Sequence, residues 1–321
     1  MSFRINCGSV ALMKRDSIHY NACCHAHDKD SEISSQMAQR VVEPDTSQQT
    51  RLIRIEPARG WAALDLGELW VFRDLLMILA MRDVKLRYKQ TALGVIWVIL
   101  QPLVAALIFA LIFGRFANLP SAGVPYLLFV YAGILPWNLF AGALQRAGNS
   151  LVSDSKLISK VYFPRMTIPI ASSAAVLVDF IVALAVMAGL LVIYQHPVTP
   201  NILALPFFLL LALLISVGVS LFLSALNVYY RDFMYALPFL IQVWMYASPV
   251  VYSADLIPGP LQPFYAINPM VGVIDGFRWS LLGLGAFPVV SVTISVVSGL
   301  ILFFAGAAVF QRVERNFADV I

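Results

Sequence analysis

Six apolar runs, each about as long as a membrane is thick, constrain this chain more than any other feature of its sequence. They lie near residues 92–114, 125–145, 168–194, 202–226, 234–252 and 287–309. A helix needs roughly 20 apolar residues to cross a hydrocarbon core of about 30 Å. The chain is 60% hydrophobic and 12% charged, about half the charged share of an ordinary soluble domain. The sequence therefore predicts an all-α, polytopic membrane protein with six transmembrane helices.

The basic residues predict which side each loop faces. Six spans place both termini on one side of the membrane. From Arg73 onward, 12 Lys and Arg then fall on that side, and two, Arg115 and Arg278, fall on the other. Because cytoplasmic loops carry an excess of Lys and Arg, we expect both termini to be cytoplasmic.

The segments around the spans have distinct compositions. Residues 1–55 are polar and cannot bury a core, so we expect a disordered cytoplasmic tail. Residues 56–316 form the predicted transmembrane domain, and residues 317–321 form a short cytoplasmic C-terminal end. Within that domain, residues 61–90 place apolar residues at three- to five-residue steps with charges between them, which indicates an amphipathic helix on the membrane surface.

Two connections between spans are longer than simple turns. We expect residues 146–166 to be a cytoplasmic connection that contains a short amphipathic helix. In the external connection, residues 253–286, the pair Asn268-Pro269 is a strong helix start because Asn caps and Pro occupies the first helical position. The residues that follow are too few and too charged to span. This pattern predicts a partly inserted external helical hairpin.

Catalytic motifs are absent from the sequence. No Gly-rich loop ends in Gly-Lys-Ser or Gly-Lys-Thr, the pattern that cradles nucleotide phosphates. We therefore expect a transport permease rather than an enzyme, with any ATP hydrolysis performed by a separate subunit. The tail gathers potential metal ligands, but their spacing matches no closed structural zinc site, so no metal site is expected. These tail residues are Cys23, Cys24, His25, His27, Asp28 and Asp30.

Six motifs occur in an order and at spacings that agree with the six-span topology. They are Met81–Gly94 with Trp97 and Gln101-Pro102, Leu135–Phe140, Leu157–Arg165, Asn227–Asp232, Ser248–Tyr252, and Asn268–Met270 with Arg278. Over residues 61–316 this set resembles the permeases of polysaccharide and teichoic-acid ABC exporters of the O-antigen type, which belong to the type-2 ABC transporter family.

The resemblance implies a homodimer of permeases in the bacterial inner membrane, bound to two ATPase subunits that carry ATP and Mg. No cofactor is expected on this chain, and nucleic acid is not expected as a partner. The substrate would be a lipid-linked glycan of the O-antigen, capsule or teichoic-acid type, and the sequence leaves the choice among them open. The cytoplasmic connection would dock on the ATPase through an apolar, partly basic set of residues. These are Leu157, Ile158, Lys160, Val161 and Phe163.

The resemblance also implies where the substrate passes. The amphipathic helix would lie at the cytoplasmic entrance, and the first and fifth spans would line the channel. Aromatic faces stack on sugar rings, so Trp97, Trp244 and Tyr246 are channel candidates, although an interfacial aromatic girdle explains most such residues. A basic run before the first span either sets topology, which we favour, or contacts the lipid diphosphate. Its members are Arg82, Lys85, Arg87 and Lys89.

Two other classes of function compete with an ABC exporter. An ion-coupled secondary transporter or stand-alone flippase predicts paired intramembrane charges or an internal repeat. The clearest charge within a span, Asp179, has no evident Lys, Arg or His partner in another span, which favours a helix–helix contact or a polar cavity over a proton relay. A membrane enzyme acting on lipid-linked sugars would need clustered ligands, and the external loop offers only Asp255, Asp275 and Arg278.

Overall fold

A computed structural model divides the chain into two units, Met1–Arg59 and Gly60–Ile321. It describes residues 66–89, 94–158, 160, 163–230, 232–258 and 265–314, all of which belong to the second unit. The predicted tail, with its Cys and His residues, lies outside the described residues. The account that follows concerns the second unit alone.

The described regular structure is entirely helical, which confirms the predicted all-α class. Five helices are long and apolar enough to cross a membrane. They are α4 (Gly94–Phe109) with its π-helical continuation Ala110–Phe116, α5 (Tyr126–Ser153), α7 (Thr167–Ile193), α8 (Leu205–Tyr229) with the preceding 3-10 turn Pro200–Ala204, and α12 (Val289–Glu314). The sixth predicted span appears as a shorter apolar helix, α9 (Phe233–Tyr246), of 14 residues.

The segments outside the spans also contain helices. The predicted surface helix forms α2 (Leu66–Val71) and α3 (Arg73–Lys89), which a turn at Phe72 separates. The first long connection contains the four-residue helix α6 (Ser155–Ile158). The external connection contains a 3-10 turn, Ala254–Leu256, and helix α11 (Pro269–Leu282).

The predicted start of α11 is confirmed by its cap. The Asn268 side chain accepts a hydrogen bond from the Met270 backbone N–H at 3.1 Å, and Pro269 occupies the first turn. Residue 146, the predicted start of the cytoplasmic connection, lies within helix α5. Helix α5 continues to Ser153, because Ala147 and Leu151 keep an apolar stripe at helical spacing and are both completely buried.

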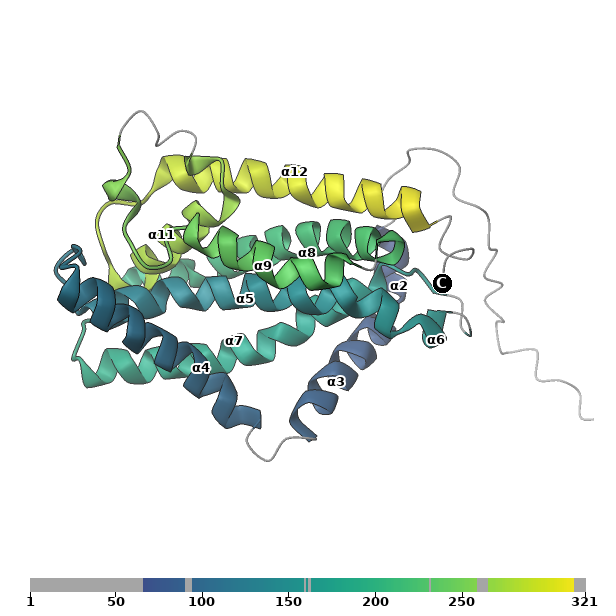
Figure 1. Ribbon diagram of the computed structural model, residues 1–321, viewed down its shortest axis with the longest axis horizontal. Helices are drawn as coiled ribbons and strands as arrows, with labels where there is room; N and C mark the ends of the chain where they lie inside the picture. The colour runs from purple at the N-terminus through teal and green to yellow at the C-terminus, as the bar shows by residue number, and fades with distance from the viewer. Residues whose placement is uncertain are drawn as a thin grey trace, which may run out of the picture. The chain divides into compact units, whose positions relative to one another are not determined.

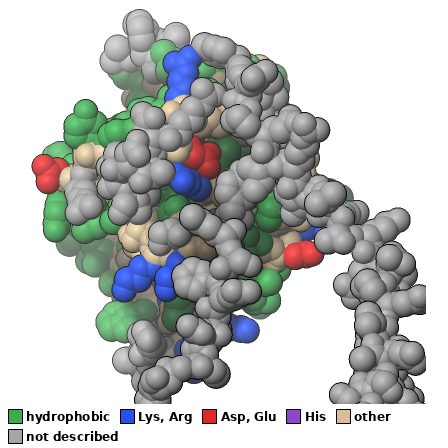
Figure 2. Space-filling model, turned by 90° about the vertical axis from the view of Figure 1, so that its right-hand side faces the viewer, with side chains coloured by type: hydrophobic (Ala, Val, Ile, Leu, Met, Phe, Trp, Pro, Cys, Tyr) green, Lys and Arg blue, Asp and Glu red, His purple; other side chains and the backbone are tan. Residues whose placement is uncertain are grey.

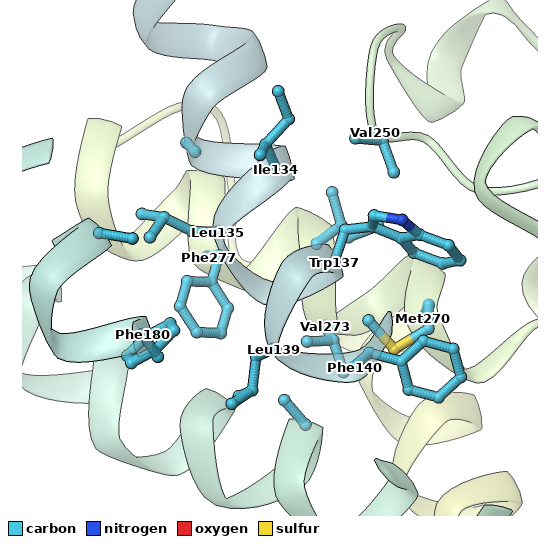
Figure 3. Close-up of a cluster of buried hydrophobic side chains, with 14 of the residues drawn as sticks. Ile134, Leu135, Trp137, Leu139, Phe140, Phe180, Val250, Met270, Val273 and Phe277 are labelled. Atoms are coloured by element: carbon cyan, nitrogen blue, oxygen red, sulfur yellow. The ribbon is translucent and has the colours of Figure 1, made fainter. Parts of the chain in front are cut away.

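Helix α5 is the central element of the bundle (Figure 1). It packs against α4, α7, α8, α9 and α11. In its most apolar 18-residue stretch, 78% of residues are buried, against 17% in α4. Figure 3 shows the resulting core, in which α5 side chains meet Phe180 of α7 and Phe277 of α11. These two rings contact each other edge to face, with centroids 5.9 Å apart.

The two ends of the bundle differ in charge. At one end, called here the α6 end, α5, α8 and α12 end and α7 begins. At the other, the α11 end, lie the external connection and the end of α4. Of the described Lys and Arg residues, all except Arg115 and Arg278 belong to the half nearer the α6 end. Figure 2 views the α6 end, where Lys and Arg side chains lie among hydrophobic ones.

A second hydrophobic cluster, the α6-end core, joins α3 to the ends of the spans. It is separate from the central core and includes both buried residues of α3. Its buried members are Leu79, Ala80, Leu151, Phe163, Met166, Ile168, Ala171, Leu221, Ala225, Val228, Ala307 and Phe310.

Helices α8 and α12 approach each other closely at a pair of glycines. A Cβ atom added to Gly306 would lie 2.1 Å from the carbonyl oxygen of Gly218. Small residues at such crossings let two backbones come into direct van der Waals contact inside a membrane. The α8–α12 pairing therefore depends on the missing side chain at Gly306.

We expect Gly306→Ala to lower the thermal stability of the purified protein in detergent, because the added methyl group forces the two backbones apart. Overpacking of this kind costs about 1–3 kcal/mol. Gly189→Ala in α7 is the matched control, since a Cβ there meets nothing within 4 Å. Thermal unfolding of the two variants measures the effect, and equal melting temperatures would contradict the close packing.

Candidate functional site

Helix α3 is attached to the spans by two groups of polar side chains. At the first, Arg82 donates to Asp154 at 2.6 Å and to Asp83 at 2.8 Å. Asp154 caps the end of α5, so this arginine joins α3 to α5. Ser172 of α7 completes the group by donating to the other oxygen of Asp83 at 2.9 Å. The hydrogen bond to Asp154 is the main reason that the pKa of Arg82 is raised above its usual value.

The second group surrounds Asp179 of α7. Its Oδ2 accepts hydrogen bonds from Arg87 of α3 and, at 2.8 Å, from Arg146 of α5. Its Oδ1 accepts one from the Tyr88 hydroxyl at 2.5 Å. The side chain of Asp179 is 16% exposed, that of Arg146 27% and that of Arg87 38%. We call these four residues the Asp179 cluster.

The Asp179 cluster corrects the prediction that this carboxylate has no basic partner in another span. Asp179 does contact neighbouring helices, which is one of the two interpretations that the sequence favoured. Asp179 lies 12 residues after the start of α7, about 18 Å along the helix axis at 1.5 Å per residue. Sequence reasoning missed its partners because Arg146 was assigned to a loop, whereas α5 extends past it.

Tyr88 serves the cluster as a hydrogen-bond donor. Burial raises the pKa of its hydroxyl to about 12, and the hydrogen bond to Asp179 adds to this effect. The hydroxyl therefore stays protonated at neutral pH. Its proton is then available to Asp179 throughout the physiological range.

The other members of the basic run remain at the surface. Lys85 and Lys89 are exposed, whereas Arg82 and Arg87 form the internal ion pairs described above. Together with apolar neighbours on α3, the members of the basic run other than Arg87 border a shallow groove of about 490 Å³. The groove is lined by Met77, Ile78, Met81, Arg82, Lys85, Leu86 and Lys89. Such a mixture of apolar and cationic side chains suits an anionic amphiphile.

The residues of the predicted docking connection differ in burial: some are packed against the bundle and others are exposed. Phe163 is only 5% exposed and belongs to the α6-end core, so it anchors the connection and is not available to a partner. Leu157 and Ile158 are half-buried against the same core, and Lys160 is exposed. Val161 lies outside the described residues.

The chain that follows is fastened to α12. The Arg165 backbone N–H donates to Glu314 Oε1 and its guanidinium donates to the Glu314 carbonyl, both at 3.1 Å. The connection is therefore held at both of its ends, by α5 before it and by α12 after it.

The three channel candidates lie in different surroundings. Trp97 on α4 is 57% exposed and Tyr246 on α9 is 59% exposed. Trp244 instead packs edge to face on Phe140, with centroids 5.0 Å apart, and its indole N–H donates to Asn268 at 3.0 Å. Trp244 thus joins α9 to the start of α11.

A shallow hollow of about 560 Å³ lies on α4 around Trp97. Its lining is otherwise apolar except for one exposed glutamine, Gln101. A polar side chain within a span is costly unless it faces protein or water. The complete lining is Trp97, Leu100, Gln101, Val104, Ala105 and Ile108.

At the α11 end, Arg278 is buried to 4% exposure and fastens the external connection. It donates to the backbone carbonyls of Val250 at 2.8 Å, Tyr252 at 3.1 Å and Phe129 at 3.3 Å. Its guanidinium also lies 3.7 Å from the centre of the Phe129 ring. Burial lowers the pKa of Arg278 to about 10, so the side chain still carries its charge at neutral pH.

Two of the external charges that the sequence singled out can be compared with the structure only in part. Arg278 is used by backbone carbonyls, and the side chain of Asp255 lies outside the described residues. Within the described ranges, no three His, Cys, Asp or Glu side chains are placed to hold a metal ion.

Helices of membrane length with wide apolar exposure define a polytopic membrane protein. The family comparison is more specific. The chain belongs to the ABC-2 type transporter family, whose model matches residues 74–282. This family supplies the permease of a transporter and not a catalytic subunit.

Several curated proteins are similar over most of their length. The O-antigen export system permease protein RfbA of Klebsiella pneumoniae is 27% identical over 249 residues, which cover 77% of this chain and 95% of that protein. RfbA of Myxococcus xanthus is 28% identical over 258 residues, covering 79% and 98%. The polysialic acid transport protein KpsM of Escherichia coli is 22% identical over 240 residues, covering 74% and 92%.

We expect Phe163→Ala to destabilise the protein, because it empties a site in the α6-end core. Truncation of a buried phenylalanine costs about 3–5 kcal/mol. Lys160→Ala, three residues earlier and exposed, is the control and should change stability by less than about 0.5 kcal/mol. Thermal unfolding in detergent compares the two. A Phe163→Ala variant as stable as the parent would show that this side chain is not an anchor.

Proposed function

We propose that the chain is the permease subunit of an ATP-driven exporter that moves a lipid-linked polysaccharide across the bacterial inner membrane. One observation carries this proposal. The chain aligns with 92% to 98% of the length of relatives named for O-antigen export or polysialic acid transport. The family model matches residues 74–282, which include nearly all of α3 and the helices from α4 to α11.

The charge distribution supports an orientation with the α6 end in the cytoplasm. Nearly all described basic residues belong to the half nearer that end, as expected for cytoplasmic loops. The connection that carries Lys160 is there too, and it is the segment that meets the ATPase in this proposal. ATP and Mg bind to that separate subunit, and the permease assembles as a homodimer.

The exposed faces of α4 and α9 support a route for the glycan between two copies of the chain. Each face carries one exposed aromatic candidate, Trp97 or Tyr246, and one exposed glutamine, Gln101 or Gln242. Gln242 donates to the Tyr246 hydroxyl at 3.3 Å. Aromatic rings beside amide groups offer both a stacking surface and hydrogen bonds to a sugar.

The Asp179 cluster is the one feature that favours a secondary transporter, since it pairs charges from different spans. Its geometry argues against ion coupling. Oδ2 already accepts from two guanidinium groups and Oδ1 from Tyr88. Even without Arg87 and Tyr88, a coupling cation would have to compete with the guanidinium of Arg146 for the carboxylate.

Gentle purification from the native membrane tests the proposed assembly. We expect a stoichiometric ATPase to accompany the permease, with hydrolysis that depends on both subunits. Lys160→Glu should reduce the amount of copurified ATPase several-fold, because it reverses a charge on the docking connection. Arg115→Glu makes the same reversal on an exposed residue at the opposite end and should have no effect. Substrate movement by a pure, ATP-independent protein would overturn the exporter proposal.

For the channel, we expect Trp97→Ala to reduce glycan export several-fold, because it removes a stacking surface from the α4 face. Phe304→Ala on α12 is matched in exposure, since both aromatic side chains are 57% exposed, and should leave export unchanged. Both variants are scored by surface glycan per assembled transporter. Equal export by the two variants would place Trp97 among ordinary lipid-facing aromatics.

A further inference from the structure

Helices α3 and α4 pack against α7, and α4 also against α5, yet few of their side chains are buried. Only Leu79 and Ala80 of α3 are buried. In the described part of α4, buried residues form a single narrow stripe at Val98, Pro102 and Ala106. Arg87 and Tyr88 lie in the last turn of α3, and α4 begins at Gly94. The Asp179 cluster is therefore the attachment nearest the junction between the two helices.

The two polar groups that hold α3 differ in their charge balance. At the first, a single arginine, Arg82, meets two carboxylates, and the neighbouring residues Leu79 and Ala80 add apolar packing. At the second, the single carboxylate of Asp179 meets two arginines. The first is reinforced by the α6-end core, whereas no side chain in the last turn of α3 is buried.

This difference decides which attachment can open at low cost. Removing the only partner of a buried charge is strongly unfavourable, because the charge is left uncompensated. Asp179 does not face that penalty when α3 leaves. Arg146 comes from α5, a neighbouring span, and remains paired with Asp179 after Arg87 and Tyr88 have gone. The released Arg87 side chain is already 38% exposed.

We propose that Asp179 is a latch for the junction of α3 and α4. Arg146 is its permanent partner, and Arg87 and Tyr88 are partners that are released during the transport cycle. The segment around Leu79 and Arg82 acts as the fixed pivot, and the last turn of α3 moves together with the start of α4. Asp179 is thereby a positioning residue for export, and the release step rests on the transport function proposed above.

Distance measurements between spin labels test the latch directly. The three native cysteines are replaced, and labels are attached at Lys89→Cys on α3 and Ile181→Cys on α7, both exposed positions. Labelled chain is diluted with unlabelled chain so that distances within one copy dominate. The measurement is made on the isolated permease, and on the complete transporter before and during ATP turnover.

We expect one main distance at rest and a second, longer distance during turnover. Asp179→Asn should raise the longer population several-fold without ATP, and Asp179→Glu should restore the resting distance. Tyr88→Phe, which removes one donor only, should shift the populations in the same direction by less. Asp74→Asn is the control, since Asp74 is 90% exposed in its pair with Arg73.

The possible failures are distinguishable. A single distance that persists through turnover would make the cluster a static clamp and overturn the latch, while the exporter function would stand. An unchanged distance in Asp179→Asn and in Tyr88→Phe would show that the cluster does not hold α3 at all. If no ATPase accompanies the permease, the exporter proposal fails, and the resting comparison of the variants still decides whether the cluster holds α3.

Discussion

A polar group inside a hydrocarbon core has no water to bond with, so it must find its partner within the protein. This requirement accounts for the all-helical architecture, because an α-helix satisfies its own backbone. It also accounts for the hydrogen bonds of three serines within the spans. Ser173, Ser216 and Ser298 each donate to the carbonyl four residues earlier on their own helix, at 2.9, 2.7 and 2.7 Å. These serines thus add no unpaired donor to the bundle.

Charged side chains follow the same rule but join segments that are distant in sequence. Arg278 donates to the carbonyls of Val250 and Tyr252, which follow α9, and to that of Phe129 on α5, whose ring lies over the guanidinium. These backbone contacts hold the external connection against α5. Asp179 instead accepts hydrogen bonds from two different helices. In the proposed latch, Arg87 of α3 leaves while Arg146 of α5 stays. We therefore expect the contacts of Arg278 to be permanent and part of those of Asp179 to be releasable.

Local patterns in the sequence were enough to predict the framework of the fold. Apolar length located the spans, and Asn268-Pro269 located the start of α11, because both signals depend on residues close together in the chain. The end of α5 was missed because its last two turns mix polar residues with a buried stripe. The boundaries of α9 were also less clear, since its apolar run continues into turns after Tyr246.

The candidate site was predictable only in part, because its contacts join residues far apart in sequence. The basic run and the docking connection could be named from residue types, but not their partners. Asp179 meets Arg87 across 92 positions, and Arg165 meets Glu314 across 149. No spacing rule encodes such a pair. Likewise, the apolar character of Phe163 suited a docking surface and a buried core equally, and only packing against α7 and α12 decides for the core.

The unequal burial of the spans bears on where a substrate can pass. Helix α5 is enclosed by its neighbours, so the centre of one chain is filled with side chains. Helices α7 and α12 also expose apolar faces, and the faces of α4 and α9 carry the exposed glutamines Gln101 and Gln242. An amide group facing lipid alone would lack hydrogen-bond partners, which is costly in hydrocarbon. These faces are better matched to a second copy of the chain or to a polar substrate than to lipid. A conduit formed between chains requires α4 to shift as the conduit widens, and such a shift requires a releasable attachment beside its start.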